Sequence, residues 1–133
     1  MITVYTDAAA LGNPGICTAG IVIKNGNVFS EYSFFLGELS NHEAEFTAVI
    51  HALELCKEQY AGQVISIRSD SKVTVDTLDS RYTKNRLFMP YLEKVKELEQ
   101  YFPFVFYKWI PEKSNKQADQ IARNRLIKET RSP

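Results

Sequence analysis

Apolar residues in the first third of the chain come in short β-rich runs, a pattern typical of strands. These runs cover residues 2–6, 17–24 and 28–36. Gly12-Asn13-Pro14-Gly15 separates the first run from the second, and Asn25-Gly26-Asn27 separates the second from the third. Both connecting sequences favour tight turns. We therefore expect the first three strands to form an antiparallel meander.

The hydrophobic pattern changes after Asn41, where apolar residues begin to recur with a helical period. Six residues share one face of this predicted helix, at i, i+4, i+7, i+8, i+11 and i+15: Glu45, Val49, Ala52, Leu53, Cys56 and Tyr60. Gly62 ends the helix. One acidic residue, Glu45, thus lies among apolar neighbours on the face that should contact a sheet.

The rest of the chain alternates strands with helices. Strands are predicted over residues 64–68 and 104–110, and helices over residues 71–78, 90–101 and 114–128. Pro90 suits the first turn of its helix, and Ser114-x-x-Gln117 has the spacing of a capping box. Parallel neighbours require connections that contain a helix. The order of elements therefore predicts an α/β fold, a mixed sheet with helices packed on its faces.

The composition is that of a soluble globular domain. Of the 133 residues, 44% are hydrophobic and 24% charged, and we expect one domain over residues 1–133. The N-terminus lacks the features of a signal peptide, and no apolar stretch approaches the roughly 18 residues that span a bilayer. Cys17 and Cys56 lack C-x-x-C spacing and are interpreted as buried thiols. We predict a cytoplasmic protein with no membrane partner.

The net charge is zero, but the charges are unevenly distributed. From Lys108 to the end, seven basic residues stand against three acidic ones. Such an excess is compatible with a phosphate-bearing partner, and a solvated helix face explains it equally well. The preceding strand carries four aromatic residues, Phe104, Phe106, Tyr107 and Trp109. They can stack on bases, but their alternation along a strand favours a place in the core.

Four acidic residues have no obvious structural use in this predicted fold: Asp7, Glu45, Asp70 and Asp119. Asp7 and Asp70 each follow a predicted strand, and ligands of α/β sheets bind outside the carboxyl ends of the strands. Glu45 lies in the first turns of one helix and Asp119 one turn into another. Each helix can present its carboxylate to the same edge of the sheet. Glu43, three residues after Ser40, is explained as a capping-box partner.

Three of these carboxylates also have ordinary explanations when taken singly. Asp70 can cap the helix that starts at Ser71, Asp7 can cap the turn that follows it, and Asp119 can favour a helix N-terminus. Glu45 is harder to explain, because an unpaired carboxylate on an apolar face is costly. Converging carboxylates repel one another unless cations neutralise them. Oxygen ligands favour Mg²⁺ or Mn²⁺, which in pairs catalyse phosphodiester hydrolysis.

The chain resembles the type 1 ribonuclease H family, within the retroviral-integrase-like superfamily. The segments that carry the resemblance are Tyr5-Thr6-Asp7, Gly12-Asn13-Pro14-Gly15, Ser40-Asn41-His42-Glu43-Ala44-Glu45, Ser69-Asp70-Ser71 and Asn115-Lys116-Gln117-Ala118-Asp119. The resemblance covers nearly the whole chain. It implies a ribonuclease H-like five-stranded sheet in the order 3-2-1-4-5 and metal-dependent hydrolysis of the RNA strand of RNA/DNA hybrids.

The resemblance also implies roles for the four carboxylates, with two Mg²⁺ or Mn²⁺ ions per site. Asp7 would bridge both ions. Glu45 and Asp70 would hold the ion nearer the leaving group, and Asp119 the ion that activates water. We expect an RNA/DNA hybrid as partner, no organic cofactor and a monomeric protein.

Three further residues match positions that contact the substrate in the family. Asn13 and Asn41 match residues at the minor groove of the hybrid, and Ser40 matches a position near a DNA-phosphate pocket. An amide can both donate to and accept from a base edge or a 2′-hydroxyl. Turn and cap chemistry is the alternative explanation for all three residues.

The chain departs from the family pattern at several points. Ala8 stands where the family usually has glycine, residues 111–115 contain no histidine, and residues 79–90 are too few for the basic protrusion of some members. His42 is interpreted as structural. Two alternatives to a hybrid nuclease therefore stay open. One is a nuclease of the same superfamily with another nucleic acid as substrate, and the other is a non-catalytic or weakly active protein that binds nucleic acid.

Overall fold

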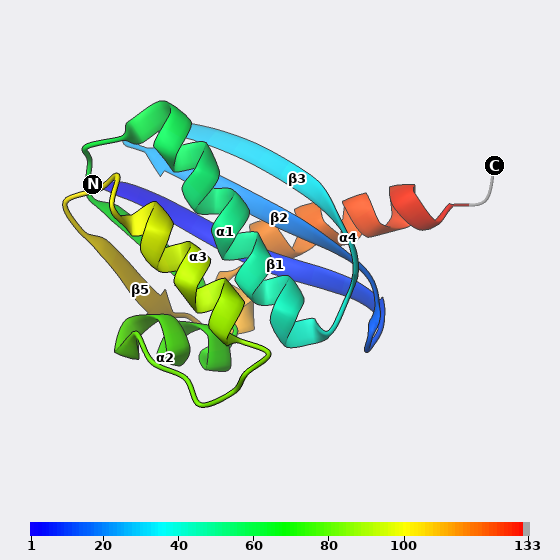
Figure 1. The fold of residues 1–133 in the computed structure, drawn as a ribbon. Helices are drawn as coiled ribbons and strands as arrows, with labels where there is room; N and C mark the ends of the chain where they lie inside the picture. The colour runs from blue at the N-terminus through cyan, green and yellow to red at the C-terminus, as the bar shows by residue number, and fades with distance from the viewer. Residues whose placement is uncertain (132–133) are drawn as a thin grey trace.

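The computed structural model describes residues 1–131 and has a five-stranded sheet with helices on both faces (Figure 1). In chain order the elements are β1 (Ile2–Gly12), β2 (Gly15–Asn25), β3 (Val28–Leu39), α1 (Asn41–Tyr60), β4 (Ile65–Ser69), α2 (Lys72–Ser80), α3 (Met89–Glu99), β5 (Val105–Trp109), a 3₁₀ turn (Glu112–Ser114) and α4 (Lys116–Thr130). The strand order is β3-β2-β1-β4-β5, which confirms the predicted fold class.

The pairing of the strands follows from their connections. The strands β1, β2 and β3 are joined by tight turns and pair antiparallel, whereas β4 pairs parallel with both β1 and β5. Helices α1 and α3 pack together on one face of the sheet, and α4 packs against β1, β2 and β3 on the other (Figure 1). The antiparallel meander is thus confirmed.

Strand β1 is longer than the sequence predicted. The pattern placed its end at Thr6, but its ladder with β2 continues to the pair Gly12 and Gly15. Asp7 therefore lies within β1 and not at its end. The parallel ladder with β4, however, stops at the pair Thr6 and Ser69. Asp7 and Asp70 are the first residues beyond that ladder. They therefore lie side by side at this edge of the sheet as predicted, because the β1–β4 pairing ends there and not because β1 ends there.

The main core lies between the sheet and the pair α1 and α3. The predicted apolar face of α1 is buried at Val49, Ala52, Leu53 and Cys56. Phe46, which the periodicity did not select, is the largest fully buried side chain. Ser40 caps α1, and the capping box with Glu43 is present as predicted.

The start of α4 differs from the prediction. Ser114 lies in the 3₁₀ turn, so the predicted capping box between Ser114 and Gln117 does not form. Asn115 occupies the N-cap position without a side-chain cap, because its amide donates to the carbonyl of Thr6 at 2.8 Å instead. Gln117 donates to Glu31 on β3 at 2.6 Å.

The aromatic residues of the last strand are also placed differently. They were expected in the core, but Phe104, Phe106 and Trp109 are 65%, 52% and 46% exposed. Tyr107 alone of the four is partly buried, and its hydroxyl donates to Glu99 at 2.7 Å. β5 is an edge strand. Alternation along the strand could not show that α4 packs on the other end of the sheet.

Cys17 and Cys56 are both free and buried, as the sequence predicted. Within residues 1–131, no helix has both the length and the apolar character needed to cross a membrane.

Candidate active site

Three carboxylates from three different elements meet beyond the parallel ladder of β1 and β4. Asp7 comes from β1, Glu45 from the first turns of α1, and Asp70 directly follows β4. Each offers one carboxylate oxygen, and these oxygens all lie within 4.8 Å of one another. The three residues line a pocket of about 210 Å³ together with Ala8, Glu112, Asp119 and Arg123.

Among residues 1–131, no basic side chain forms an ion pair with Asp7, Glu45 or Asp70. Asp7 is 5% exposed and accepts one hydrogen bond, from the backbone amide of Ala8 at 2.9 Å. The Oε1 atom of Glu45 is buried and has no hydrogen-bond partner among the described residues. A buried carboxylate oxygen without a partner is unfavourable. Its environment therefore fits an additional cationic ligand.

The electrostatics of the group point the same way. Burial, followed by the charge of Asp70, raises the pKa of Asp7 to about 8. Burial and then the charge of Asp7 raise the pKa of Glu45 well above its usual value. Burial raises the pKa of Asp70 as well, although a hydrogen bond from Asn115 opposes the shift. Without a cation, burial and mutual repulsion thus favour the protonated forms of these groups.

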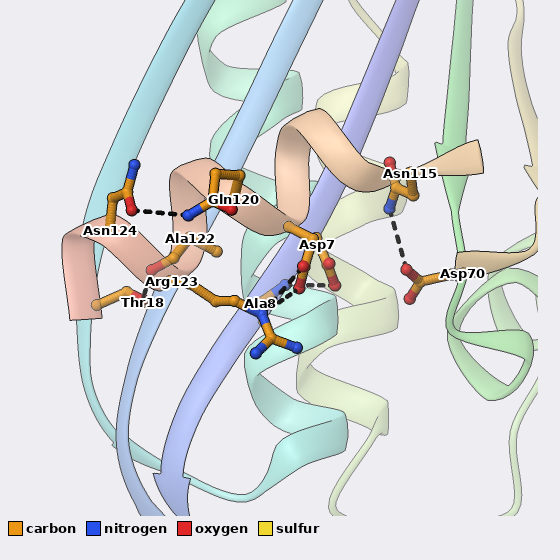
Figure 2. A network of polar contacts seen from close by, with 10 residues as sticks. Asp7, Ala8, Thr18, Asp70, Asn115, Gln120, Ala122, Arg123 and Asn124 are labelled. Carbon is orange, nitrogen blue, oxygen red and sulfur yellow. Dashed lines mark hydrogen bonds and ion pairs between the residues drawn. The ribbon is translucent and has the colours of Figure 1, made fainter. Parts of the chain in front are cut away.

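Asn115 orients Asp70, a role that the sequence analysis did not assign. The side chain is buried, and its Nδ2 donates to Oδ2 of Asp70 at 3.3 Å (Figure 2). The same Nδ2 donates to the backbone carbonyl of Thr6. The indole of Trp109 donates to the backbone carbonyl of Asp70 at 3.1 Å. Asp70 does not cap α2, because Ser71 occupies that position. In the sequence, the only indication of this role of Asn115 is its position four residues before Asp119.

Asp119 lies on the rim of the pocket, in the first turn of α4. It is not one of the three carboxylates that meet within 4.8 Å. Its two oxygens accept from Nε of Arg123 at 2.9 and 3.0 Å, one turn further along the helix. The structure thus places all four predicted carboxylates at one pocket, and the sequence analysis missed the guanidinium that faces the fourth.

Gly20 allows α4 to approach the sheet beside Asp7. It pairs with Asp7 across the β1–β2 ladder, and a Cβ atom at Gly20 would lie 2.2 Å from the carbonyl oxygen of Ala118. Ala118 and Ala122 are fully buried, and Oγ1 of Thr18 donates to the carbonyl of Ala122 at 2.7 Å (Figure 2). A glycine inside a strand marks such an approach, and the sequence analysis did not use this signal.

Asn13 and Asn41 lie together at a neighbouring pocket of about 560 Å³, which Ala8, Glu45 and Asp119 also line. Oδ1 of Asn13 accepts from the backbone amide of Asn41 at 3.0 Å. Ser40 is used differently, because its hydroxyl and backbone amide bond to Glu43. A substrate contact at Ser40 therefore stays a prediction.

Of two further titratable residues in this region, Glu112 lines the carboxylate pocket and His42 does not. Glu112, which the sequence analysis did not select, lines the carboxylate pocket from the 3₁₀ turn and stands in the segment that lacks a histidine. His42 is exposed and makes an edge contact with Phe88, with ring centroids 5.8 Å apart. This placement is consistent with a structural role for His42.

A mixed five-stranded sheet that carries acidic residues on β1, α1, the end of β4 and α4 defines the ribonuclease H-like class of proteins. Residues 5–125 match the model of the family described as reverse transcriptase-like. The chain belongs to this family, as a member of its type 1 ribonuclease H group.

Known proteins of similar sequence support this assignment. The Enterococcus faecalis protein EbsB, provisionally named a hydrolase, is 40% identical over 129 residues, which are 96% of each chain. A ribonuclease H of Chlorobium limicola is 35% identical over 83 residues, which are 62% of this chain and 55% of that protein.

Solved structures of similar fold agree. LC11-RNase H1, solved in complex with an RNA/DNA hybrid, is 28% identical and superposes with a TM-score of 0.91, covering 98% of this chain and 100% of that one. RNase H1 of Halobacterium salinarum is 27% identical with a TM-score of 0.88, covering 96% and 98%. The family and the enzyme class predicted from the sequence are thus confirmed.

Proposed function

We propose that this chain is a metal-dependent endonuclease that hydrolyses the RNA strand of RNA/DNA hybrids. The observation that carries the proposal is the convergence of oxygens of Asp7, Glu45 and Asp70 within 4.8 Å, with a buried oxygen of Glu45 that has no hydrogen-bond partner within residues 1–131. The likeness to an RNase H1 that binds an RNA/DNA hybrid supports the choice of substrate.

The donor set fits two hard divalent cations. Asp7, Glu45 and Asp70 would hold one Mg²⁺ or Mn²⁺ ion, and Asp7 and Asp119 would hold the second, because both ions prefer carboxylate oxygens. When bound, such a pair lowers the pKa of a water molecule and stabilises the charge that develops on the departing O3′. The absence of cysteine and histidine from the pocket lining argues against zinc.

The residues of this chain supply preorganisation. The backbone amide of Ala8 fixes Asp7, Asn115 fixes Asp70, and the packing of α1 on the sheet fixes Glu45. These carboxylates therefore need little rearrangement before the reaction, which lowers its barrier. Arg123 pairs with Asp119 and so reduces the repulsion between Asp119 and the other carboxylates.

The groove beside the pocket supplies the substrate contacts. Asn13 and Asn41 lie next to each other in it, at the side of Glu45 and Asp119. Their amides suit the minor groove of a hybrid, where base edges and 2′-hydroxyls are displayed. The 2′-hydroxyl is the group by which such a site distinguishes RNA from DNA. Ala8 lines both the groove and the carboxylate pocket, so its methyl group lies where the cut strand would pass.

The test is cleavage of a labelled RNA/DNA hybrid with Mg²⁺ or Mn²⁺, beside duplex DNA and duplex RNA. We expect cleavage of the hybrid alone, loss of cleavage in Asp7→Asn, and normal cleavage in Glu58→Gln, a control at an exposed carboxylate of α1. Cleavage of another duplex would replace the proposed substrate. Hybrid binding without turnover by the folded wild-type protein would instead support a binding protein.

A further inference from the structure

The face of the sheet that carries α4 has an open end lined with aromatic and basic side chains. Residues paired directly across neighbouring strands point to the same face. One cross-strand row over all five strands contains Phe29, Lys24, Thr3, Ser66 and Phe106. The next row contains Glu31, Val22, Tyr5, Arg68 and Lys108. Three of these ten side chains are basic and one is acidic.

In the part of the chain that the structure describes, no helix covers this end of the sheet on the α4 side. Helix α4 packs against β1, β2 and β3, and in Figure 1 it runs behind them and away from β5. Phe29 and Phe106 are 54% and 52% exposed, and Phe104 stacks on Phe106 with ring centroids 5.9 Å apart. Phe29 lies on the β3 edge of the sheet, and Phe104 and Phe106 lie at its β5 edge, so exposed rings stand at both ends of these rows. Exposed apolar surface of this kind marks an interaction site.

Two basic side chains of this surface make cation–π contacts with aromatic rings. Nζ of Lys24 lies 4.9 Å from the centre of the Phe29 ring, and the guanidinium of Arg68 lies 5.7 Å from that of Tyr5. The Nε atom of Arg68 is buried and has no hydrogen-bond partner among residues 1–131. A guanidinium with an unpaired N–H group can donate a hydrogen bond to an anionic ligand. Glu31, the acidic member of the rows, is bonded to Gln117.

We propose that this aromatic–basic face, defined as Tyr5, Lys24, Phe29, Arg68, Phe104, Phe106 and Lys108, binds single-stranded nucleic acid. Proteins that bind unpaired strands combine rings on which bases stack with basic side chains that contact the phosphates. The rings cannot stack on the bases of a double-stranded hybrid, because those bases are already stacked on one another, so the combination of rings and basic side chains favours an unpaired strand. The inference therefore adds a second nucleic-acid site to the hybrid site proposed above.

The face adjoins the carboxylate pocket. Tyr5 and Arg68 each precede a carboxylate, Asp7 or Asp70, by two residues, which is about 7 Å along a strand. Asn115 lies between the two regions: it donates to Asp70 and also lines a hollow of about 190 Å³ with Tyr5, Lys24 and Phe29. An unpaired stretch next to a bound hybrid could thus continue onto this face.

A second copy of the chain fits this face less well than a polyanion does. A symmetric dimer brings the same patch of both chains together. Lys24, Arg68 and Lys108 would then face their own copies, and like charges placed opposite one another are destabilising. A phosphate backbone has the complementary charge.

The test measures binding of fluorescently labelled 15-nucleotide single strands of RNA and DNA by anisotropy, in EDTA and over a series of salt concentrations. We expect binding that Phe106→Ala weakens by about 5-fold or more, since stacking on one ring contributes strongly. Lys108→Ala should weaken binding and reduce the slope of log affinity against log salt by about 0.7, the value for one phosphate contact. The controls are Tyr82→Ala and Lys94→Ala, at exposed positions outside the face, and they should bind normally.

Several results would overturn the proposal. One is the absence of single-strand binding at low salt, and another is binding that Phe106→Ala and Lys108→Ala leave unchanged although circular dichroism shows both folded. A wild-type dimer in sedimentation that Phe106→Ala converts to monomer would instead assign the face to a contact between copies. Hybrid cleavage with Mg²⁺ is a separate measurement, so its failure would leave the result for single strands standing.

Discussion

Glu43 and Glu45 are carboxylates two residues apart in the first turns of α1, and their environments are opposite. Glu43 accepts hydrogen bonds from Ser40 and from the hydroxyl of Tyr91, at 2.9 and 2.7 Å, and the Tyr91 bond leads in lowering its pKa. Glu45 has a raised pKa and a buried oxygen with no hydrogen-bond partner in the described part of the chain. The protein satisfies one carboxylate by itself and leaves the other for a ligand.

The difference shows that one turn of α1 carries both a carboxylate that stabilises the fold, Glu43, and a carboxylate that serves function, Glu45. Glu43 closes the capping box, so its charge favours the folded state. Glu45 costs stability where it lies, because its burial beside Asp7 opposes ionisation. A group that destabilises the fold and points at two other carboxylates is explained by function and not by packing.

The largest expected effect is on hybrid cleavage, when each of the two glutamates is replaced by glutamine. Glu45→Gln should reduce hybrid cleavage by at least about a hundredfold, because it removes a negative ligand from the cation site. Glu43→Gln should stay within a few-fold of wild type. Initial rates at saturating Mg²⁺ measure both. Equal losses in the two variants would show that position along α1, and not the environment of the carboxylate, decides activity.

The next effect concerns the placement of α4. Gly20→Ala should destabilise the fold by about 2 to 3 kcal/mol, because the new Cβ would collide with the backbone of α4 at Ala118. Cleavage should fall as well, since Asp119 would move relative to Asp7. Urea unfolding and hybrid cleavage measure the two effects. A control is Gly62→Ala, where a Cβ meets nothing within 4 Å and only the positive φ of 85° is strained. Normal activity in Gly20→Ala would contradict this account of α4.

The third effect is a pH dependence of stability in the metal-free protein. Asp7 and Glu45 have raised pKa values in the folded state, so the folded state keeps protons that the unfolded chain has released. The contribution of Asp7 to the unfolding free energy is fully present below about pH 4 and is lost as the pH rises to about 8, and the contribution of Glu45 changes with pH in the same direction. Glu43, with a lowered pKa, acts with the opposite sign and at lower pH.

The measurement is urea unfolding in EDTA from pH 4 to pH 9, for wild type and Asp7→Asn. The stability of wild type relative to Asp7→Asn should fall by on the order of 5 kcal/mol across this range. Mg²⁺ should restore wild-type stability most at high pH, where the carboxylates are ionised and bind it. A difference that does not change with pH would show that Asp7 titrates normally.

A smaller effect is expected at Asn115, which orients one carboxylate. Asn115→Ala should reduce cleavage about 10- to 100-fold, because such outer partners hold metal ligands in place. The Mg²⁺ concentration for half-maximal activity should rise as well, a change that a purely structural role would not produce. Asn124→Ala, on the outer surface of α4, is the control. Loss of stability with an unchanged Mg²⁺ requirement would assign Asn115 to folding alone.

The smallest effect sharpens the structural half of the comparison. Glu43→Gln should lower the unfolding free energy by about 1 kcal/mol at pH 7, since it removes the charge from the capping box and from the bond with Tyr91. Glu45→Gln should leave the metal-free protein as stable as wild type or more so. The same urea series measures both variants. The reverse order of stability would contradict the division of roles between the two residues.

The sequence predicted most of the site because its chemistry is local to short segments. Of the four carboxylates, only Glu45 stands out from its own neighbours, and Asp7, Asp70 and Asp119 were identified by their joint placement at one edge of the sheet and by the resemblance to the family. Asn115 and Gly20 were not identified, because their roles depend on contacts between distant parts of the chain. Asn115 contacts Thr6 across 109 residues of sequence. No local pattern contains that information.

The errors in the fold have the same origin. Alternation of Phe104 and Phe106 with other residues shows that β5 is a strand, but not that its outer face lacks a covering helix. Ser114 and Gln117 have the spacing of a capping box, but the box does not form. Asn115 takes the N-cap position and its side chain bonds to the distant Thr6. Local pattern thus predicts elements well, and it fails where a remote segment decides what covers them.

The central claim is that Asp7, Glu45 and Asp70 form a cation site, and anomalous diffraction from crystals soaked in Mn²⁺ tests it most directly. The account predicts an anomalous peak within bonding distance of carboxylate oxygens from all three residues, lost in crystals of Glu45→Gln and kept in those of Glu43→Gln. Crystals of the wild-type protein that bind Mn²⁺ elsewhere, with these three carboxylates left without an ion, would contradict it.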